Sequence, residues 1–371
     1  MLAGVLSLCG VSVQATPFFA RMYNFKCVVC HSGVPRLNSF GLEFKYNNFR
    51  IPGAEKSAPL AWQKTVPLAV QVQPTTERAS PGAHKADFTD TQLLAGGLLT
   101  RTTSFYVHHS LWIDDKPVEF PSYEVWVQQV LSEHGKVMLK LGQFELPYGY
   151  SPFTHKVTVF TPLVYGSGIQ GNDVRLGAAM RGFQLSAQFP HVARVYVATG
   201  APSLLSTGNT IGEREFFGDF RDVFIRVASP NPARSISGFV YITSPTRDPA
   251  DPTTHNDGQR FGLEGTLLWR GFEFDGLAVY GENSNPLGTG HKGVLRGGFL
   301  EVDKMLRPWV GLTGRWDVQT ISTTSSVYSD ALTLSIRFYP IPAQRALRLT
   351  AEYQSADHGR SSTSLQASVS F

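Results

Sequence analysis

The segment KVMLKLGQF, residues 136–144, places Val137, Leu139 and Leu141 at every second position. A period of two puts alternate side chains on opposite faces of an extended chain, so this segment is expected to be a β-strand with one apolar face. The same period recurs on both sides of it, in KTVPLAVQVQ (64–73), TSFYVHHSLWI (103–113), DVRLGAAM (173–180), FRDVFIRV (220–227), RSISGFVYI (234–242), RFGLEGTLLW (260–269), FEFDGLAVY (272–280), RPWVGLTGRW (307–316), DALTLSIRF (330–338), RALRLTAEY (345–353) and SLQASVSF (364–371).

Turn-rich stretches such as SPTRDPADPTTHNDGQ (244–259) and GENSNPLGTGHKG (281–293) separate these segments. Segments of about ten residues with alternating hydrophobicity between turns are typical of outer-membrane β-barrels. We count about sixteen candidate strands, a number that leaves a water-filled lumen. A soluble β-sandwich is the alternative. The absence of helical periodicity after the first fifty residues, and a final strand that ends in Phe371, favour an antiparallel barrel over residues 61–371.

The composition agrees with a barrel. Of the 371 residues, 42% are hydrophobic and 17% are charged, which is poor in charge yet not strongly apolar. This mixture disfavours a helical membrane protein and a disordered chain. The net charge of +4, without a dense lysine or arginine run, argues against a nucleic-acid partner.

The first fifteen residues are predicted to be a secretory signal peptide. The apolar run from Leu2 to Val13 is too short to span a bilayer and ends in the small-x-small pattern Val13-Gln14-Ala15. Cys9 lies in this segment and is expected to be removed with it. The mature chain would keep Cys27 and Cys30 and would lie outside the cytoplasm.

The motif KCVVCHSG, residues 26–33, predicts covalent attachment of one haem c. Two thiols one helical turn apart can add to the two vinyl groups of one haem, and His31 follows as the proximal iron ligand. A structural zinc site would need a second ligand pair. A thioredoxin-like pair would need a βαβ context, and a plain disulfide leaves His31 without a role.

The segment around the motif, residues 16–60, is predicted to be a small haem-binding domain. RLNSFGLEFKYNNF (36–49) has Leu37, Phe40, Gly41 and Phe44 at helical spacing, so one amphipathic helix is expected. This is too little protein to enclose a haem. The lumen of the barrel could supply the missing cover if the segment plugs it.

The N-terminal stretch resembles the fused outer-membrane monohaem cytochrome c–porins, a family that includes ferrous-iron oxidases of iron-oxidising bacteria. The matching residues are Phe19-Ala20-Arg21, Cys27 to His31, Pro35, Leu37, Phe40-Gly41 and Phe44-Lys45. The chain departs from the family pattern at Leu42, where the family has arginine, and at Asn48-Phe49, where it has Gly-Tyr. LGQFELPYGYSPF (141–153) also resembles a strand–loop motif of phosphate-selective porins, and it suits a loop that folds into the lumen.

The resemblance implies an electron-transfer protein of the bacterial outer membrane. An external donor, Fe(II) or another, would reduce the haem, and a periplasmic electron-carrier cytochrome would collect the electron. The alternative is a diffusion porin, of anion or phosphate type, with a structural or sensory haem. A haem enzyme such as a peroxidase is a third class, but no distal base can be named for it. A homo-oligomer is compatible with each of these three functions.

The distal haem ligand has three candidates, Met22, His84 and His108. Met22 is five residues before Cys27, and His84 lies in a turn. His108 should face the lumen if its neighbours Val107 and His109 face lipid. The periplasmic partner and the distal ligand are not determined by the sequence.

A cation entry site is conceivable in the loop RDPADPTTHNDG, which carries Asp248, Asp251, His255 and Asp257. Oxygen ligands with one histidine would suit Fe(II). A hydrated polar loop is the simpler interpretation of this segment.

Overall fold

The computed structural model describes residues 18–63, 65–80, 82–87, 91–113, 116–117, 123–169, 175–202, 222–243, 256–342, 345–357 and 360–371. The predicted signal peptide, 1–15, lies outside the described residues. Among these, no helix is long and apolar enough to cross a membrane.

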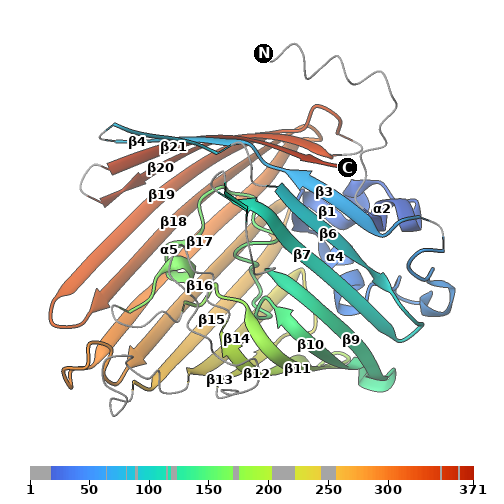
Figure 1. Cartoon of the computed structure of the whole chain (residues 1–371), viewed down its shortest axis with the longest axis horizontal. Coiled ribbons are helices and arrows are strands. Elements are labelled where there is room, and N and C mark those ends of the chain that lie inside the picture. The colour runs from blue at the N-terminus through green and yellow to red at the C-terminus, as the bar shows by residue number, and fades with distance from the viewer. Residues whose placement is uncertain are drawn as a thin grey trace.

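The chain forms a closed antiparallel β-barrel preceded by a short helical segment (Figure 1). Its strands are β3 (Leu68–Val72), β4 (Thr75–Ala79), β5 (Ala83–Asp87), β6 (Thr91–Leu98), β7 (Thr103–Ile113), β8 (Lys116–Pro117), β9 (Glu124–Ser132), β10 (Val137–Phe144), β11 (Met180–Phe189), β12 (Ala193–Pro202), β13 (Asp222–Ala228), β14 (Arg234–Thr243), β15 (Gly258–Trp269), β16 (Phe272–Asn283), β17 (Gly293–Arg307), β18 (Val310–Ser322), β19 (Ser326–Phe338), β20 (Leu347–Ala356) and β21 (Arg360–Ser370).

These strands make sixteen spans of the wall. β3 and β4 are two halves of one span, because both pair with β21. β5 and β6 are halves of the next, since β4 pairs with β5 and β3 with β6. β8 only extends β7, so β7 and β9 to β21 supply the other fourteen spans. The prediction of a mainly β chain with about sixteen strands is confirmed.

The side chains of each span alternate between a polar lumen and an apolar outer surface. In β19, Leu332, Leu334 and Ile336 are exposed, whereas Thr333, Ser335 and Arg337, which alternate with them, are buried. The same alternation places Leu141 of β10 outside and Lys140 inside. An outward apolar band with a polar interior is the pattern that lipid on the outside requires.

The two ends of the barrel differ. The connections at 99–102, 133–136, 190–192, 229–233, 270–271 and 308–309 are short turns at one end, where the C-terminus also lies. The longer connections, at 145–179, 203–221 and 244–257, leave from the opposite end. In outer-membrane barrels the short turns face the periplasm and the long loops face outside.

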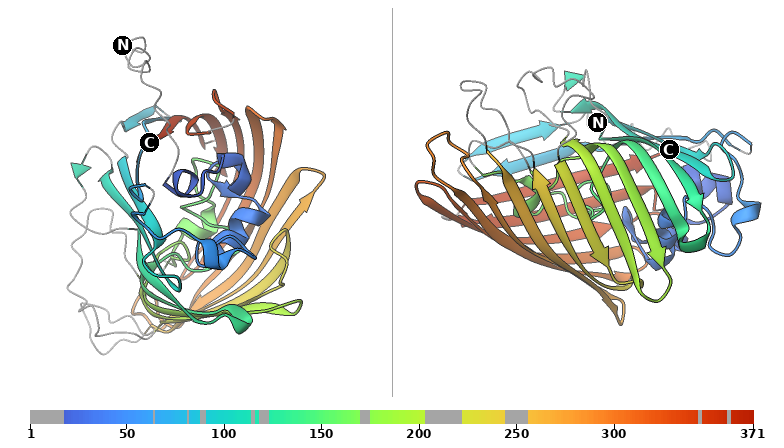
Figure 2. Two further views of the ribbon diagram at one scale, coloured as in Figure 1. Left: turned by 90° about the vertical axis from the view of Figure 1, so that its right-hand side faces the viewer. Right: turned by 90° about the horizontal axis from the view of Figure 1, so that it is seen from below.

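Residues 18–63, here called the plug, lie in the short-turn mouth of the barrel. They contain α2 (Phe18–Tyr23), α3 (Cys27–Cys30), β1 (His31–Gly33), β2 (Arg36–Leu37), α4 (Ser39–Tyr46) and the 3-10 turn η2 (Glu55–Ser57). Figure 2, left, shows the plug inside the ring of strands. The helical segment therefore does plug the lumen, as expected. It meets the wall at Ala61, whose N–H donates to the Leu98 carbonyl at 2.7 Å.

The plug helix α4 is shorter than the helix predicted over 36–49. It begins after Asn38, whose side chain accepts from the Gly41 N–H at 2.9 Å. It ends before Asn48 and Phe49, which both have positive φ. A side-chain N-cap fixes the start of a helix, so Arg36 and Leu37 are left to pair with β1.

The connection between β10 and β11 also enters the lumen. Residues 145–169 and 175–179, here called the inward loop, carry the short helix α5 (Leu163–Gly166). Figure 1 shows α5 within the barrel outline, between the walls. The LGQFELPYGYSPF motif thus runs from β10 into a lumen-folding loop, as predicted.

Candidate functional site

An aromatic cluster holds the plug together. The ring of Phe19 lies 5.4 Å from that of Phe44 and 4.5 Å from that of Phe49. The cluster reaches the wall where Phe49 stacks on Trp126 of β9, with ring centroids 5.7 Å apart. These contacts bury Phe44 and Phe49 to 5% exposure each. The plug therefore shares one apolar core with the barrel wall rather than having a core of its own.

The two cysteines of the motif begin and end α3, a single helical turn. Cys27 is buried and Cys30 is half-buried. The start of α4 fixes this turn: the Asn38 N–H donates to the Cys30 carbonyl at 2.9 Å, and the Asn38 side chain donates to the Val29 carbonyl at 3.0 Å. A Cβ at Gly41 would lie 2.2 Å from the Cys30 carbonyl oxygen, so α4 packs directly on the backbone of the turn.

Both thiols are held in the protonated form. Burial raises the pKa of Cys27, and burial together with the neighbouring Cys27 raises the pKa of Cys30 to about 11.

His31 follows α3 in an extended conformation, as the first residue of β1. Its Nδ1 donates to the carbonyls of Pro35, at 3.0 Å, and Arg36, at 3.2 Å. Because Nδ1 carries the proton, Nε2 has the free lone pair of this imidazole. Burial lowers the pKa of His31 to about 4, so the ring is neutral at neutral pH. The hydrogen-bond acceptors of His31 Nδ1 are thus two backbone carbonyls, which the sequence alone does not identify.

The three candidate distal ligands lie in different places. Met22 is buried on α2, and a Cβ at Gly97 of β6 would lie 3.0 Å from its terminal methyl group, so it packs on the wall. His84 is exposed on β5, in the hairpin at the long-loop end, away from the plug. His108 of β7 faces the lumen as predicted, but its Nε2 bonds Gln92 Oε1 at 2.9 Å. Among the described residues, the hydrogen bonds of the His31 side chain go to Pro35 and Arg36, and not to any of these three candidates.

Asp248, Asp251 and His255 of the predicted cation loop lie outside the described residues. Asp257 is bonded to Ser284 in both directions: the Ser284 N–H donates to the Asp257 carbonyl at 2.8 Å, and the Asp257 N–H donates to Ser284 Oγ at 2.9 Å. Within the described part of the chain, no group of three or more histidines, cysteines or carboxylates is arranged to hold a metal ion.

Carboxylates of the barrel wall hold the inward loop in the lumen. The two oxygens of Glu264 accept from the Gly149 N–H at 3.0 and 3.1 Å. Glu352 accepts from the Val159 and Phe160 N–H groups, each at 2.8 Å. The loop is thus anchored on two stretches of the wall, because β15 and β20 are five strands apart in the sheet order.

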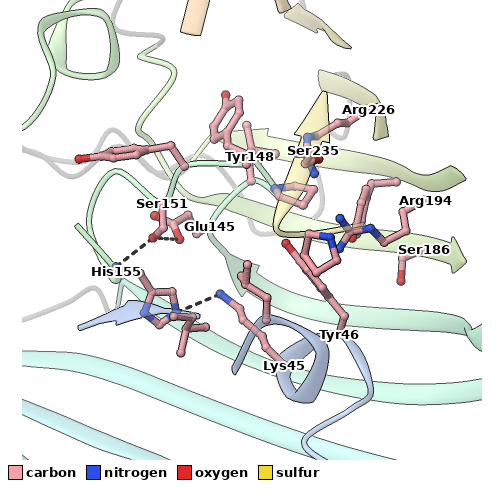
Figure 3. Close-up of a pocket in the computed structure, with 18 of the residues that line it drawn as sticks. Lys45, Tyr46, Glu145, Tyr148, Ser151, His155, Ser186, Arg194, Arg226 and Ser235 are labelled. Carbon is pink, nitrogen blue, oxygen red and sulfur yellow. Dashed lines mark hydrogen bonds between the residues drawn. The ribbon is translucent and has the colours of Figure 1, made fainter. Parts of the chain in front are cut away.

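A cavity lies between the plug, the wall strands β9 to β16 and the inward loop. Figure 3 shows Lys45 of α4 pointing to His155, and Tyr46 lying beside Arg194. The Nζ of Lys45 lies 3.3 Å from His155 Nε2. Burial of His155 is the main cause that holds its pKa well below the ordinary value, and the positive charge of Lys45 is the next. Sequence reasoning did not find this pair, because only the folded inward loop brings the two residues together.

Six lysine and arginine side chains line the cavity, against four carboxylates, which belong to Glu124, Glu145, Glu273 and Asp275. Lys140 has its Nζ 4.3 Å from the Trp126 ring, and the Arg194 guanidinium lies 4.7 Å from the Tyr46 ring. The Glu145 carboxylate accepts from Ser151 Oγ at 2.7 Å and Thr154 Oγ1 at 2.9 Å. Burial of Glu145 is the main cause that raises its pKa, and the negative charge of the neighbouring Glu124 raises it further. The β10–β14 side of the cavity is therefore suited to anions.

No protein-family model and no curated relative matches the chain. Solved structures do. The anion-selective porin from Comamonas acidovorans has a TM-score of 0.63 at 11% identity, over 82% of this chain and 98% of the porin. The trimer form of Vibrio cholerae OmpT has a TM-score of 0.59 at 8% identity, over 82% and 98%. Salmonella typhi OmpF has a TM-score of 0.59 at 8% identity, over 82% and 97%. The chain therefore has the porin fold of the bacterial outer membrane, which confirms the predicted localisation.

Proposed function

Starting from a porin-type barrel with a plugged lumen, we propose that this chain is an electron-transfer protein of the outer membrane with one covalent haem c. Cys27 and Cys30 would form the thioether bonds, and His31 would be the proximal ligand. An external donor such as Fe(II) would supply the electron and a periplasmic carrier cytochrome would accept it. When bound, the haem supplies a one-electron iron couple.

The hydrogen bonds of His31 carry this proposal. A haem-ligating imidazole needs a proton on one nitrogen, a lone pair on the other and a fixed ring plane. The carbonyls of Pro35 and Arg36 hold the proton on Nδ1. The low pKa keeps His31 neutral.

The location of the motif also fits. The plug lies at the short-turn end, where a periplasmic carrier could approach. The plug and the inward loop together occupy the lumen, so the chain's own residues limit water access to the motif. Cys27 is 5% exposed. The wall thus provides the cover that so small a segment lacks.

The test is expression in a host that matures c-type cytochromes, followed by acid–acetone extraction. Cys27→Ala, Cys30→Ala and His31→Ala should each reduce the haem retained by the protein, whereas the control His84→Ala on the exposed hairpin should not. Oxidised protein mixed anaerobically with Fe(II) should then show rapid haem reduction by stopped-flow absorbance. Wild-type protein without covalent haem would refute the attachment. Haem that is reduced by dithionite but not by Fe(II) would refute the iron donor.

A second candidate function is a diffusion channel for anions. The cavity lined by Lys45, Lys140 and Arg194 supports it, as does the fold shared with an anion-selective porin. Planar-bilayer recording decides between the two. A large conductance with anion-selective reversal potential, weakened in Lys140→Gln and Arg194→Gln, is expected for the channel. Negligible conductance is expected if the plug keeps the lumen closed.

A further inference from the structure

Arg36 ties the turn that follows the haem motif to the barrel wall. Its side chain is buried and contacts three carboxylates on two adjacent strands. It pairs with Glu301 of β17, with Asp275 of β16 at 3.3 Å and with Glu273 of β16 at 3.9 Å. Burial alone would lower its pKa, but Glu301 and the other carboxylates raise the pKa well above its ordinary value. The residue is a permanent cation at an acidic patch of the wall.

The backbone of the same residue touches the predicted haem ligand. The Arg36 carbonyl accepts from His31 Nδ1, and its neighbour Pro35 supplies the second acceptor. The Arg36 backbone also pairs with Gly33, which closes the short β1–β2 hairpin. The Arg36 side chain thus binds the wall, while the Arg36 carbonyl in the same hairpin binds the His31 imidazole.

From this geometry we propose that Arg36 is a positioning residue that fixes the His31 imidazole by anchoring its carbonyl acceptors to β16 and β17. The inference rests on the proposed function where it concerns the haem. Hydrogen bonds to the second nitrogen of a ligating histidine set its orientation and basicity. The surroundings of the axial ligand in turn tune the haem potential. The barrel wall, and not the plug alone, thus determines the electronic environment of the iron.

Arg50 offers a matched control. It is also a buried arginine of the plug, and it also binds the wall side of the barrel, through Glu133 at 2.6 and 3.2 Å. Its other bonds go to the carbonyls of Asn47 and Arg101. None of these contacts reaches His31. A purely structural role, in which an arginine only seats the plug, predicts the same effect for both residues.

The first experiment uses the haem-free full-length barrel with ¹⁵N-labelled histidine. Exchange of the His31 Nδ1–H with solvent should be slow in the wild type. It should be about fivefold faster in Arg36→Gln, because a buried hydrogen bond is worth about 1 kcal/mol. Arg50→Gln should leave it unchanged. Since no haem is present, this result stands even if the chain never binds haem.

The second experiment measures the midpoint potential of the haem-loaded protein. Arg36→Gln should shift the potential and the Soret band, while Arg36→Lys, which keeps the charge but loses the planar fork, should give a smaller shift. Equal potentials in wild type and Arg36→Gln, or an equal shift in Arg50→Gln, would overturn the inference. If Arg36→Gln does not fold, Arg36→Lys against Arg50→Lys provides the same comparison. A wild type without haem would refute the proposed function, and the exchange experiment would still decide the role of Arg36.

Discussion

Replacement of Gly41 by alanine should loosen the turn that carries both cysteines. The new Cβ would lie 2.2 Å from the Cys30 carbonyl oxygen and 3.0 Å from the Cys30 carbonyl carbon. Ordinary contact begins near 3.4 Å, so the two backbones must separate by about 1.2 Å, the difference between these distances. No side-chain rotation can relieve a clash between two backbones. Because α4 also carries Phe44, this displacement disturbs the aromatic cluster of the plug.

The expected cost is about 2 kcal/mol. Overpacking of a well-packed site costs about 1–3 kcal/mol, and a clash with a rigid backbone is expected at the upper end of this range, about 3 kcal/mol. Alanine in a helix gains back about 1 kcal/mol over glycine. The difference corresponds to about a thirtyfold larger population of the opened plug.

Limited trypsin proteolysis of the intact barrel measures this population. Arg36 is buried, so cleavage after it requires the plug to open, and in rapid pre-equilibrium the rate follows the open fraction. Gly41→Ala should be cleaved about thirtyfold faster than wild type. Gly166→Ala is the control, because its Cβ would meet no atom within 4 Å. Equal cleavage rates for the two variants would show that α4 does not depend on its close approach to Cys30.

Two further predictions concern pH and barrel closure. In haem-free protein, His31 has a pKa of about 4 when the plug is folded, below its ordinary 6.5. The opened plug therefore binds the proton more tightly, so the stability of the plug should be complete above pH 6.5 and decline as the pH falls toward 4. Hydrogen exchange of the plug amides measures this decline. His31→Gln should flatten that slope, and a wild type without a slope would contradict the burial argument. Deletion of residues 369–371 removes the pairs of Val369 with Val72 and Ser370 with Gln71, and the Phe371 N–H bond to Val70 at 2.9 Å. The truncated chain should no longer migrate differently in gels before and after heating, which is the mark of a closed barrel. Migration like that of the wild type would show that these pairs are not needed to close the barrel.

Alternation in the sequence was sufficient to predict the wall of the barrel. Each span has one face toward lipid and one toward a polar lumen, so a period of two is imposed on nearly every strand. The interruption of the first span was not predicted. It falls at Gln73-Pro74, and proline has no N–H to donate to the ladder. The helix in the plug was predicted too long because Leu37 continues the apolar spacing although Asn38 starts the helix.

The candidate site was predictable only in its local part. Cys27, Cys30 and His31 are adjacent in sequence, so their juxtaposition follows from one helical turn. The partners of this motif come from far along the chain, such as Glu301 for Arg36. No local pattern marks a residue on a distant strand as the partner of a given cation. The pairing of Lys45 with His155 depends in the same way on the path of the inward loop.

The position of the plug constrains the order in which this protein can be assembled. The plug precedes every strand of the wall, yet it contacts β6 through Phe18, which would lie 3.0 Å from a Cβ at Gly96, and β17 through Arg36. Strands from the first and last thirds of the chain must therefore be present before the plug reaches its final contacts. The seam between β21 and β3 then seals the ring around it. If haem is attached to Cys27, which is buried in the finished barrel, the attachment would therefore have to precede the seating of the plug.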